Sequence, residues 1–75
     1  MQSIVDHPLC PGKNCWPELL MKNGEEAAAV IESENKFVTA IVLPDGTPTT
    51  FDFLCTRVFV WVNECGNVIH IPVIG

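Results

Sequence analysis

Basic residues are scarce in this sequence, and it has no long apolar run. Its 75 residues include four lysines and arginines against nine acidic residues, and the formal net charge is -5. Because so few cations cannot build a surface that follows a phosphate backbone, we expect no nucleic acid partner. The longest wholly apolar stretches, such as Val58 to Val62, are far shorter than the roughly 20 residues of a membrane-spanning helix, so we expect no membrane partner.

The sequence also lacks the motifs of the common enzyme classes. It contains no glycine-rich phosphate loop, no histidine-based zinc motif and no G-x-S-x-G elbow. His7 and His70 have no companion nucleophile at a recognisable spacing. Glu32 and Glu34 are two residues apart on an expected helix, so they point to different sides and are interpreted as a solvated face. We therefore expect no enzyme activity and no cofactor.

The chain is short enough for one domain. The nine residues Met1 to Leu9 show no periodic pattern, contain the acidic Asp6 and have no apolar core. We expect them to form a loose N-terminal arm and not a signal peptide. The apolar fraction of 48% is too high for a disordered acidic tail, so residues 10–75 are predicted to form a single domain.

The four cysteines are an even number in a small chain. They occupy positions 10, 15, 55 and 65. This pattern favours a disulfide framework, for which three full connectivities exist. A zinc site is the less favoured alternative, because the spacings Cys10-x4-Cys15 and Cys55-x9-Cys65 contain no tight C-x-x-C pair. Four reduced, buried thiols are a third interpretation, and we expect no bound metal.

The segment "NGEEAAAVIESEN" is predicted to form a helix. Asn23 is a favourable N-cap, and Glu26 stands three residues later, at the spacing of a capping box. Residues that recur at i, i+3 and i+4 predict one buried face. They are Ala27, Val30 and Ile31. Asn35 is the expected stop.

Extended segments follow the helix. "FVTAIVL" (residues 37–43) is rich in β-branched residues, and "RVFVWVN" (residues 57–63) alternates with period two. One face of the second segment carries Val58, Val60 and Val62, and the other carries Arg57, Phe59 and Trp61. "VIHIPVI" (residues 68–74) is a third, shorter piece that Pro72 should confine to an edge. With Trp16 as a core anchor, the order of elements predicts an α+β domain in which one helix packs on a small sheet.

A long loop separates the first two extended segments. It includes "GTPTTFDFLC", from Gly46 to Cys55, and loops of this length inside compact domains are usually functional or disordered. Pro48 restricts the backbone, Cys55 can tie the far end, and Arg57 can reach back under the loop. An extended, braced loop with an aromatic residue at its crown is typical of a protease substrate that has been made stiff.

Five segments together resemble the potato inhibitor I family of serine protease inhibitors. They are "CPGKNCWPEL", "NGEEAA", "AIVLPDGTPTTFDF", "CTRVFVWV" and "PVIG", and they cover nearly all of the chain from Cys10 onward. The resemblance implies a helix against a small mixed sheet, with a long exposed reactive-site loop that joins two parallel strands. It also implies a monomeric plant defence protein, secreted or vacuolar, that inhibits serine proteases of the chymotrypsin or subtilisin type.

The resemblance also implies roles for individual residues. The reactive-site loop would comprise Thr49, Thr50, Phe51, Asp52 and Phe53. The scissile bond would be Phe51–Asp52, with Phe51 as the primary specificity residue. Arg57 matches the first of two arginines that commonly brace the loop. Phe59 stands at the second of these loop-support positions, where it cannot form an ion pair, and Leu54 also stands where an arginine is common.

The cysteine pattern matches the disulfide-bearing branch of that family. This match implies a bridge between Cys10 and Cys55. Cys15 and Cys65 are extra to the pattern, and two alternatives stay open for them: a second bridge or two free thiols. Two functional rivals also remain, namely a non-inhibitory protein-binding module and a storage or defence protein whose loop is vestigial.

Overall fold

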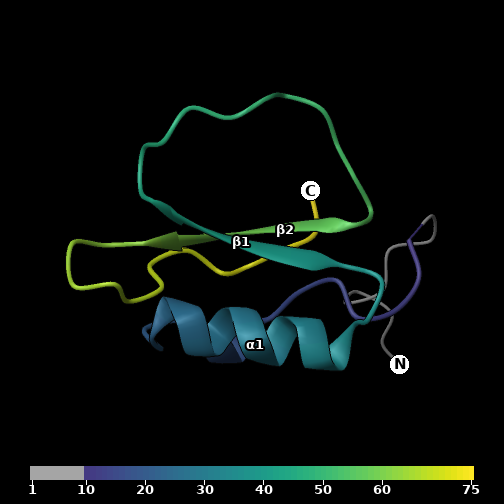
Figure 1. Ribbon diagram of the computed structural model, residues 1–75, viewed down its shortest axis with the longest axis horizontal. Helices are drawn as coiled ribbons and strands as arrows, with labels where there is room; N and C mark the ends of the chain where they lie inside the picture. The colour runs from purple at the N-terminus through teal and green to yellow at the C-terminus, as the bar shows by residue number, and fades with distance from the viewer. Residues whose placement is uncertain (1–9) are drawn as a thin grey trace.

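A computed structural model describes residues 10–75, and the arm expected at residues 1–9 lies outside the described residues. The elements are, in order, the 3-10 helix η2 (Pro17–Leu19), the helix α1 (Gly24–Glu34) and the strands β1 (Thr39–Pro44) and β2 (Arg57–Val62). Figure 1 shows α1 along one side of the strand pair, while the chain between β1 and β2 arches away on the other side. The predicted α+β class is confirmed. Within residues 10–75, no helix is long and apolar enough to cross a membrane.

Helix α1 begins and ends where the sequence predicts. The Oδ1 atom of Asn23 accepts hydrogen bonds from the main-chain nitrogens of Glu25 and Glu26 at 2.9 and 3.1 Å. These bonds satisfy donors that have no partner inside the helix. At the other end Asn35 leaves helical geometry, with φ at -139° and ψ at 99°. The local capping signal therefore determines the start of the helix, and the helix ends at the predicted residue without a side-chain cap.

The two strands pair in parallel, with Thr39 opposite Arg57 and Pro44 opposite Val62. The alternation predicted for β2 is confirmed, because its three valines are buried while the intervening residues are partly exposed. The valines share one buried cluster with Ala27 and Ile31 of α1 and with Trp16, which is fully buried as predicted. The inner face of the sheet is thus closed by the helix, and the outer face lies toward the loop.

The third extended piece differs from its prediction. Residues 68–74 form isolated antiparallel bridges, Val62 with Val68 and Val58 with Ile74, and not a continuous strand. The segment around Pro72 is not an edge as predicted, because it has neighbours on both sides: Ile74 bridges to Val58, and Pro72 O accepts a hydrogen bond from Trp16 N at 2.9 Å. The Pro72 side chain is fully buried. A proline has no N–H to donate to a ladder, which interrupts the pairing at this point.

Candidate functional site

The segment that joins β1 to β2, residues 45–56, spans the full length of the sheet. Because the strands are parallel, the chain must return from the end of β1 to the start of β2. Figure 1 shows this segment as an open arch over the sheet. Its entry is tied to the sheet, because Asp45 N donates to Val62 O at 2.9 Å and Thr47 Oγ1 donates to Pro44 O at 2.7 Å.

The arch carries all five residues of the predicted loop, and each of them is exposed. Phe51 is the extreme case, with a relative accessibility of 106%, whereas Phe53 is 52% exposed. A ring without packing partners contributes little to folding. The whole apolar area of Phe51 is therefore available for burial against another molecule.

Arg57, the first residue of β2, reaches Asp52 from beneath the arch. Its Nη2 donates to the main-chain oxygen of Asp52 at 2.8 Å and lies 3.3 Å from Asp52 Oδ1. The hydroxyl of Thr50 donates a hydrogen bond to the same Oδ1. The Asp52 carboxylate therefore connects the residue before Phe51 to the guanidinium below the loop.

This geometry changes the acidity of Asp52. The hydrogen bond from Thr50, reinforced by the charge and hydrogen bond of Arg57, holds the pKa of the Asp52 carboxyl below its ordinary value of 3.8. The carboxylate is thus ionised at neutral pH, and in that form it accepts from both neighbours.

Arg57 is itself held on two further sides. Its Nε donates to the main-chain oxygen of Gly75 at 2.6 Å, and Gly75 N donates back to Arg57 O at 2.9 Å. The Cζ atom lies 4.6 Å from the ring centroid of Phe59, a cation–π contact, and the Phe59 ring lies 5.6 Å from that of Trp61. The period-two alternation of β2 predicted that Phe59 and Trp61 share a face with Arg57, which is confirmed. No motif marked Gly75, because it is distant from Arg57 in the sequence.

The disulfide lies at the exit of the arch. Cys10 is bonded to Cys55, with the two Cα atoms 5.2 Å apart. Cys15 and Cys65 are free thiols, so the structure has no second bridge between them. In the part of the chain that the structure describes, no group of three or more His, Cys, Asp or Glu side chains is placed to hold a metal ion.

The remaining candidates from the sequence lie away from the arch. Glu32 was interpreted as part of a solvated face, but its Oε2 also accepts a hydrogen bond from the main-chain nitrogen of Ala40 at 2.9 Å. His70 is exposed, with its Nε2 3.0 Å from Asp45 Oδ1. His7 lies outside the described residues. None of these contacts forms an arrangement of nucleophile and base.

Known proteins of similar sequence and structure are protease inhibitors. A "Proteinase inhibitor" from Linum usitatissimum is 56% identical over 63 residues, which cover 84% of this chain and 91% of the relative. An "Inhibitor of trypsin and hageman factor" from Cucurbita maxima is 50% identical over 66 residues, which cover 88% of this chain and 97% of the relative. The crystal structure of bitter gourd trypsin inhibitor superposes with a TM-score of 0.86 at 48% identity, and the match covers 88% of this chain and 97% of that one.

The model of one protein family also matches the chain. The match extends over residues 9–75 and therefore includes the helix, both strands, the disulfide and the whole arch. The chain thus belongs to the potato inhibitor I family, and its relatives over most of its length are protease inhibitors.

Proposed function

We propose that the chain is a substrate-like inhibitor of chymotrypsin-like and subtilisin-like serine proteases, with Phe51–Asp52 as its reactive bond. The observation that carries the proposal is the fully exposed ring of Phe51 beside a bond whose two flanks are tied together through Asp52. A ring presented in this way suits an apolar primary pocket, where aromatic anchors contribute most to binding. The inhibitor acts as a monomer, with one copy for each protease.

The primary residue distinguishes these targets from trypsin. The Cucurbita maxima relative and the bitter gourd protein are named for trypsin. The primary pocket of trypsin has a carboxylate at its base, which favours a cation. Phe51 offers no cation, so an enzyme with an apolar pocket is the better match.

Tight binding follows from the order of the loop before docking. Binding normally costs the entropy of ordering side chains and loops at the interface. Here the main chain at Asp52 is already held by Arg57, and the arch is tied at its entry by Thr47 and at its exit by the disulfide. The loop is therefore ordered during folding, so less of the free energy of contact with the protease is lost to ordering the loop on binding.

The same contacts explain how the bond survives. Arg57 contacts the oxygen and the carboxylate of Asp52, which lie on the leaving-amine side of the proposed reactive bond. If the protease cleaves the bond, Arg57 keeps the new amine of Asp52 beside the acyl-enzyme. A tethered amine has a very high effective concentration, so resealing of the bond competes with hydrolysis.

The test is a titration of chymotrypsin and of subtilisin, each at a known active-site concentration. We expect loss of activity at one inhibitor per enzyme. After long incubation with a trace of enzyme, mass analysis under reducing conditions should show fragments that end at Phe51 and begin at Asp52. Cleavage at another bond would contradict the proposed reactive bond.

Other outcomes of this titration separate the rival functions. Binding without loss of activity would support a non-inhibitory binding module. Rapid degradation without binding would indicate a vestigial loop, because an unbraced loop is an ordinary substrate. A Phe51→Ala variant is the matched control, since it keeps the braced main chain and removes only the proposed anchor.

A further inference from the structure

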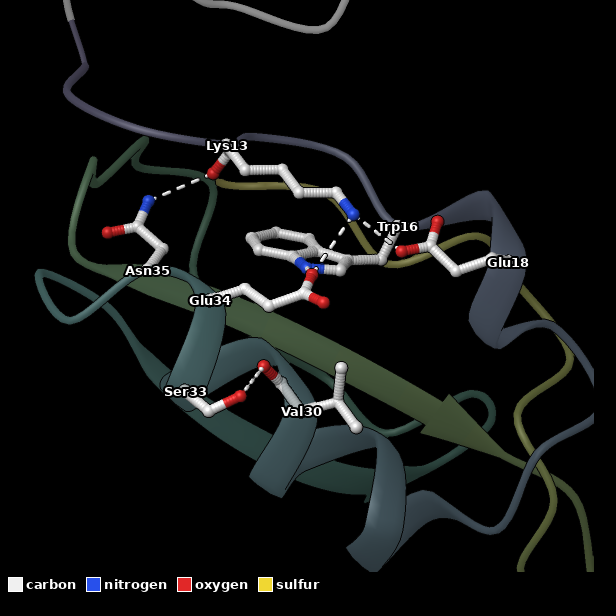
Figure 2. A network of polar contacts seen from close by, with 7 residues as sticks. All are labelled: Lys13, Trp16, Glu18, Val30, Ser33, Glu34 and Asn35. Atoms are coloured by element: carbon white, nitrogen blue, oxygen red, sulfur yellow. Dashed lines mark hydrogen bonds and ion pairs between the residues drawn. The ribbon is translucent and has the colours of Figure 1, made fainter.

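The segment that carries Cys10 is fastened to the C-terminal end of α1 by one buried amide. Asn35 is only 3% exposed. Its Nδ2 donates to Pro11 O at 3.1 Å and to Lys13 O at 2.9 Å, and its Oδ1 accepts from Phe37 N at 2.9 Å. Figure 2 shows this amide directed at the main chain of Lys13. Both donor hydrogens of the amide thus have acceptors, as a buried polar group requires.

Gly12 allows the segment to close around this amide. Its φ is +81°, a region that residues with a side chain rarely adopt. A Cβ atom at this position would lie 2.8 Å from Asn35 Nδ2, which is too close for two non-bonded atoms. Residues 11–13 therefore pack closely around the Asn35 side chain. This contact requires a residue at position 12 that tolerates a positive φ and has no Cβ atom.

A second set of contacts lies beside the first, as Figure 2 shows. Glu34 Oε1 accepts from Trp16 Nε1 at 2.9 Å and from Lys13 Nζ at 3.0 Å. Lys13 Nζ also donates to Glu18 Oε2 at 2.5 Å. The charged side chains here are partly exposed, and ion pairs of that kind contribute little on their own. Asn35 is therefore the buried polar attachment of residues 11–13 to the end of α1. Further along the segment, Asn14 O accepts from Ile74 N at 3.1 Å and Trp16 is fully buried.

The disulfide links the segment held by Asn35 to the exit of the arch. Cys10 directly precedes the segment that Asn35 holds, and its partner Cys55 lies between Asp52 and Arg57 in the sequence. A crosslink can hold the exit of a loop only as firmly as its other end is held. Cys10 is buried, which agrees with a rigid anchor.

We propose that Asn35 is a positioning residue for the reactive-site loop, acting through residues 11–13 and the Cys10–Cys55 bond; this inference rests on the proposed inhibitory function. Asn35 does not touch the loop. It determines how firmly the crosslink holds the loop exit, so a change at the end of α1 alters the lifetime of the bond that the protease attacks.

The test compares Asn35→Ala with Asn23→Ala, each with and without the disulfide. Asn23 is the matched control, because it is an asparagine that caps the opposite end of the same helix. Its side chain bonds to Glu25 and Glu26 and not to the segment that follows Cys10. The versions without the disulfide carry Cys10→Ser and Cys55→Ser. Two quantities are measured: the rate of cleavage at Phe51–Asp52 by chymotrypsin, and the hydrogen exchange of the Arg57 amide, which donates to Leu54 O at 3.3 Å across the loop exit.

With the disulfide present, we expect Asn35→Ala to speed both cleavage and exchange by about fivefold, the factor that corresponds to one net hydrogen bond. Without the disulfide, the same substitution should change neither rate. Asn23→Ala should lower the melting temperature and leave the ratio of loop exchange to core exchange unchanged. Gly12→Ala, which displaces the segment from Asn35, should reproduce the effect of Asn35→Ala and serves in its place if Asn35→Ala does not fold.

Two results would overturn the inference. One is an equal effect of Asn35→Ala with and without the disulfide, which would mean that Asn35 only stabilises the helix. The other is an equal loop effect from Asn23→Ala, which would make loop opening a consequence of global stability. Failure of the parent to inhibit any protease would instead contradict the proposed function, and the exchange of the Arg57 amide would still decide the role of Asn35.

Discussion

Replacement of Phe59 by leucine should make the reactive-site loop more mobile without creating a cavity in the hydrophobic core. Phe59 lies on the outer face of β2, where its ring contacts the guanidinium of Arg57 on one side and the ring of Trp61 on the other. Leucine keeps an apolar side chain of similar bulk but has no π face. The substitution therefore removes the cation–π contact while Arg57 keeps its hydrogen bonds to Asp52 and Gly75.

The size of the effect follows from how far Arg57 is removed from water. Cation–π contacts contribute about 0.5–1 kcal/mol at exposed sites and about 2 kcal/mol when desolvated. The Arg57 side chain is 13% exposed and its Cζ lies 4.6 Å from the ring centroid, so a value of about 1 kcal/mol is reasonable. That free energy corresponds to about a fivefold change in the inhibition constant and in the rate of loop cleavage. Loss of the ring pair with Trp61 should in addition lower the free energy of unfolding of the whole domain by about 0.5–1.5 kcal/mol.

The assay is a double-mutant cycle between Phe59→Leu and Arg57→Ala. Inhibition constants against chymotrypsin and cleavage rates at Phe51–Asp52 are measured for the parent, both single variants and the double variant. In the Arg57→Ala background, Phe59→Leu should have no further effect on the loop. Phe59→Tyr keeps the π face and should behave like the parent. Trp61→Leu should lower the free energy of unfolding but leave the coupling between Phe59 and Arg57 nearly unchanged.

An additive cycle would refute the reasoning. It would mean that Phe59 and Arg57 act on the loop independently and that the cation–π contact between them does not stabilise the loop. A Phe59→Leu protein that inhibits as well as the parent would lead to the same conclusion.

Three further predictions concern specificity, pH and the crosslink. Phe51→Lys should weaken chymotrypsin inhibition by at least about tenfold, because a charged ammonium would be desolvated in an apolar pocket, and should create trypsin inhibition; Phe53→Lys should do neither to a comparable degree, and inhibition constants for both variants decide the register of the loop. The Asp52 pKa is lowered in the native state, so its contribution to loop order is fully present above the ordinary value of 3.8 and is lost as the pH falls through the native pKa; NMR titration should place that pKa below 3.8 and show it rising in Thr50→Val. Reduction of the disulfide, which spans a sequence separation of 45, should cost about 4 kcal/mol in the chain-entropy model and lower the melting temperature, and an unchanged calorimetric transition would contradict this.

Local patterns in the sequence were sufficient for the elements themselves. Asn23 marked the start of the helix because N-capping depends on a side chain within a few residues of the helix end. Asn35 also marked its end, although its side chain does not cap the helix. The alternation in β2 identified the buried valines because side chains of a strand point to opposite faces in turn. Strand β1 begins later than predicted, at Thr39 and not at Phe37. Ends of strands are set by pairing with a neighbour, which no local signal specifies.

The support of the candidate site required the tertiary structure. The sequence alone indicated a long loop with an aromatic residue at its crown and with Cys55 and Arg57 placed to hold it. The resemblance to the family singled out Phe51 and implied the bridge from Cys10 to Cys55. The alternation of β2 placed Phe59 on the face of Arg57, but only the structure shows that its ring contacts the guanidinium and that Gly75 accepts from it. Gly75 is far from Arg57 in the sequence and becomes its neighbour only when the last residues pair beside β2.

The roles of buried and partly buried polar groups were also decided by folding. By sequence, Asn35 is a helix stop and Glu34 belongs to a solvated face, yet Asn35 holds the segment next to the disulfide and Glu34 accepts from Trp16. Pro72 looks like an edge residue and is buried. Periodicity and capping are determined within one turn or one strand, so the sequence by itself determines them. The partner of a polar side chain depends on which distant segment packs against it, and only the tertiary structure determines that.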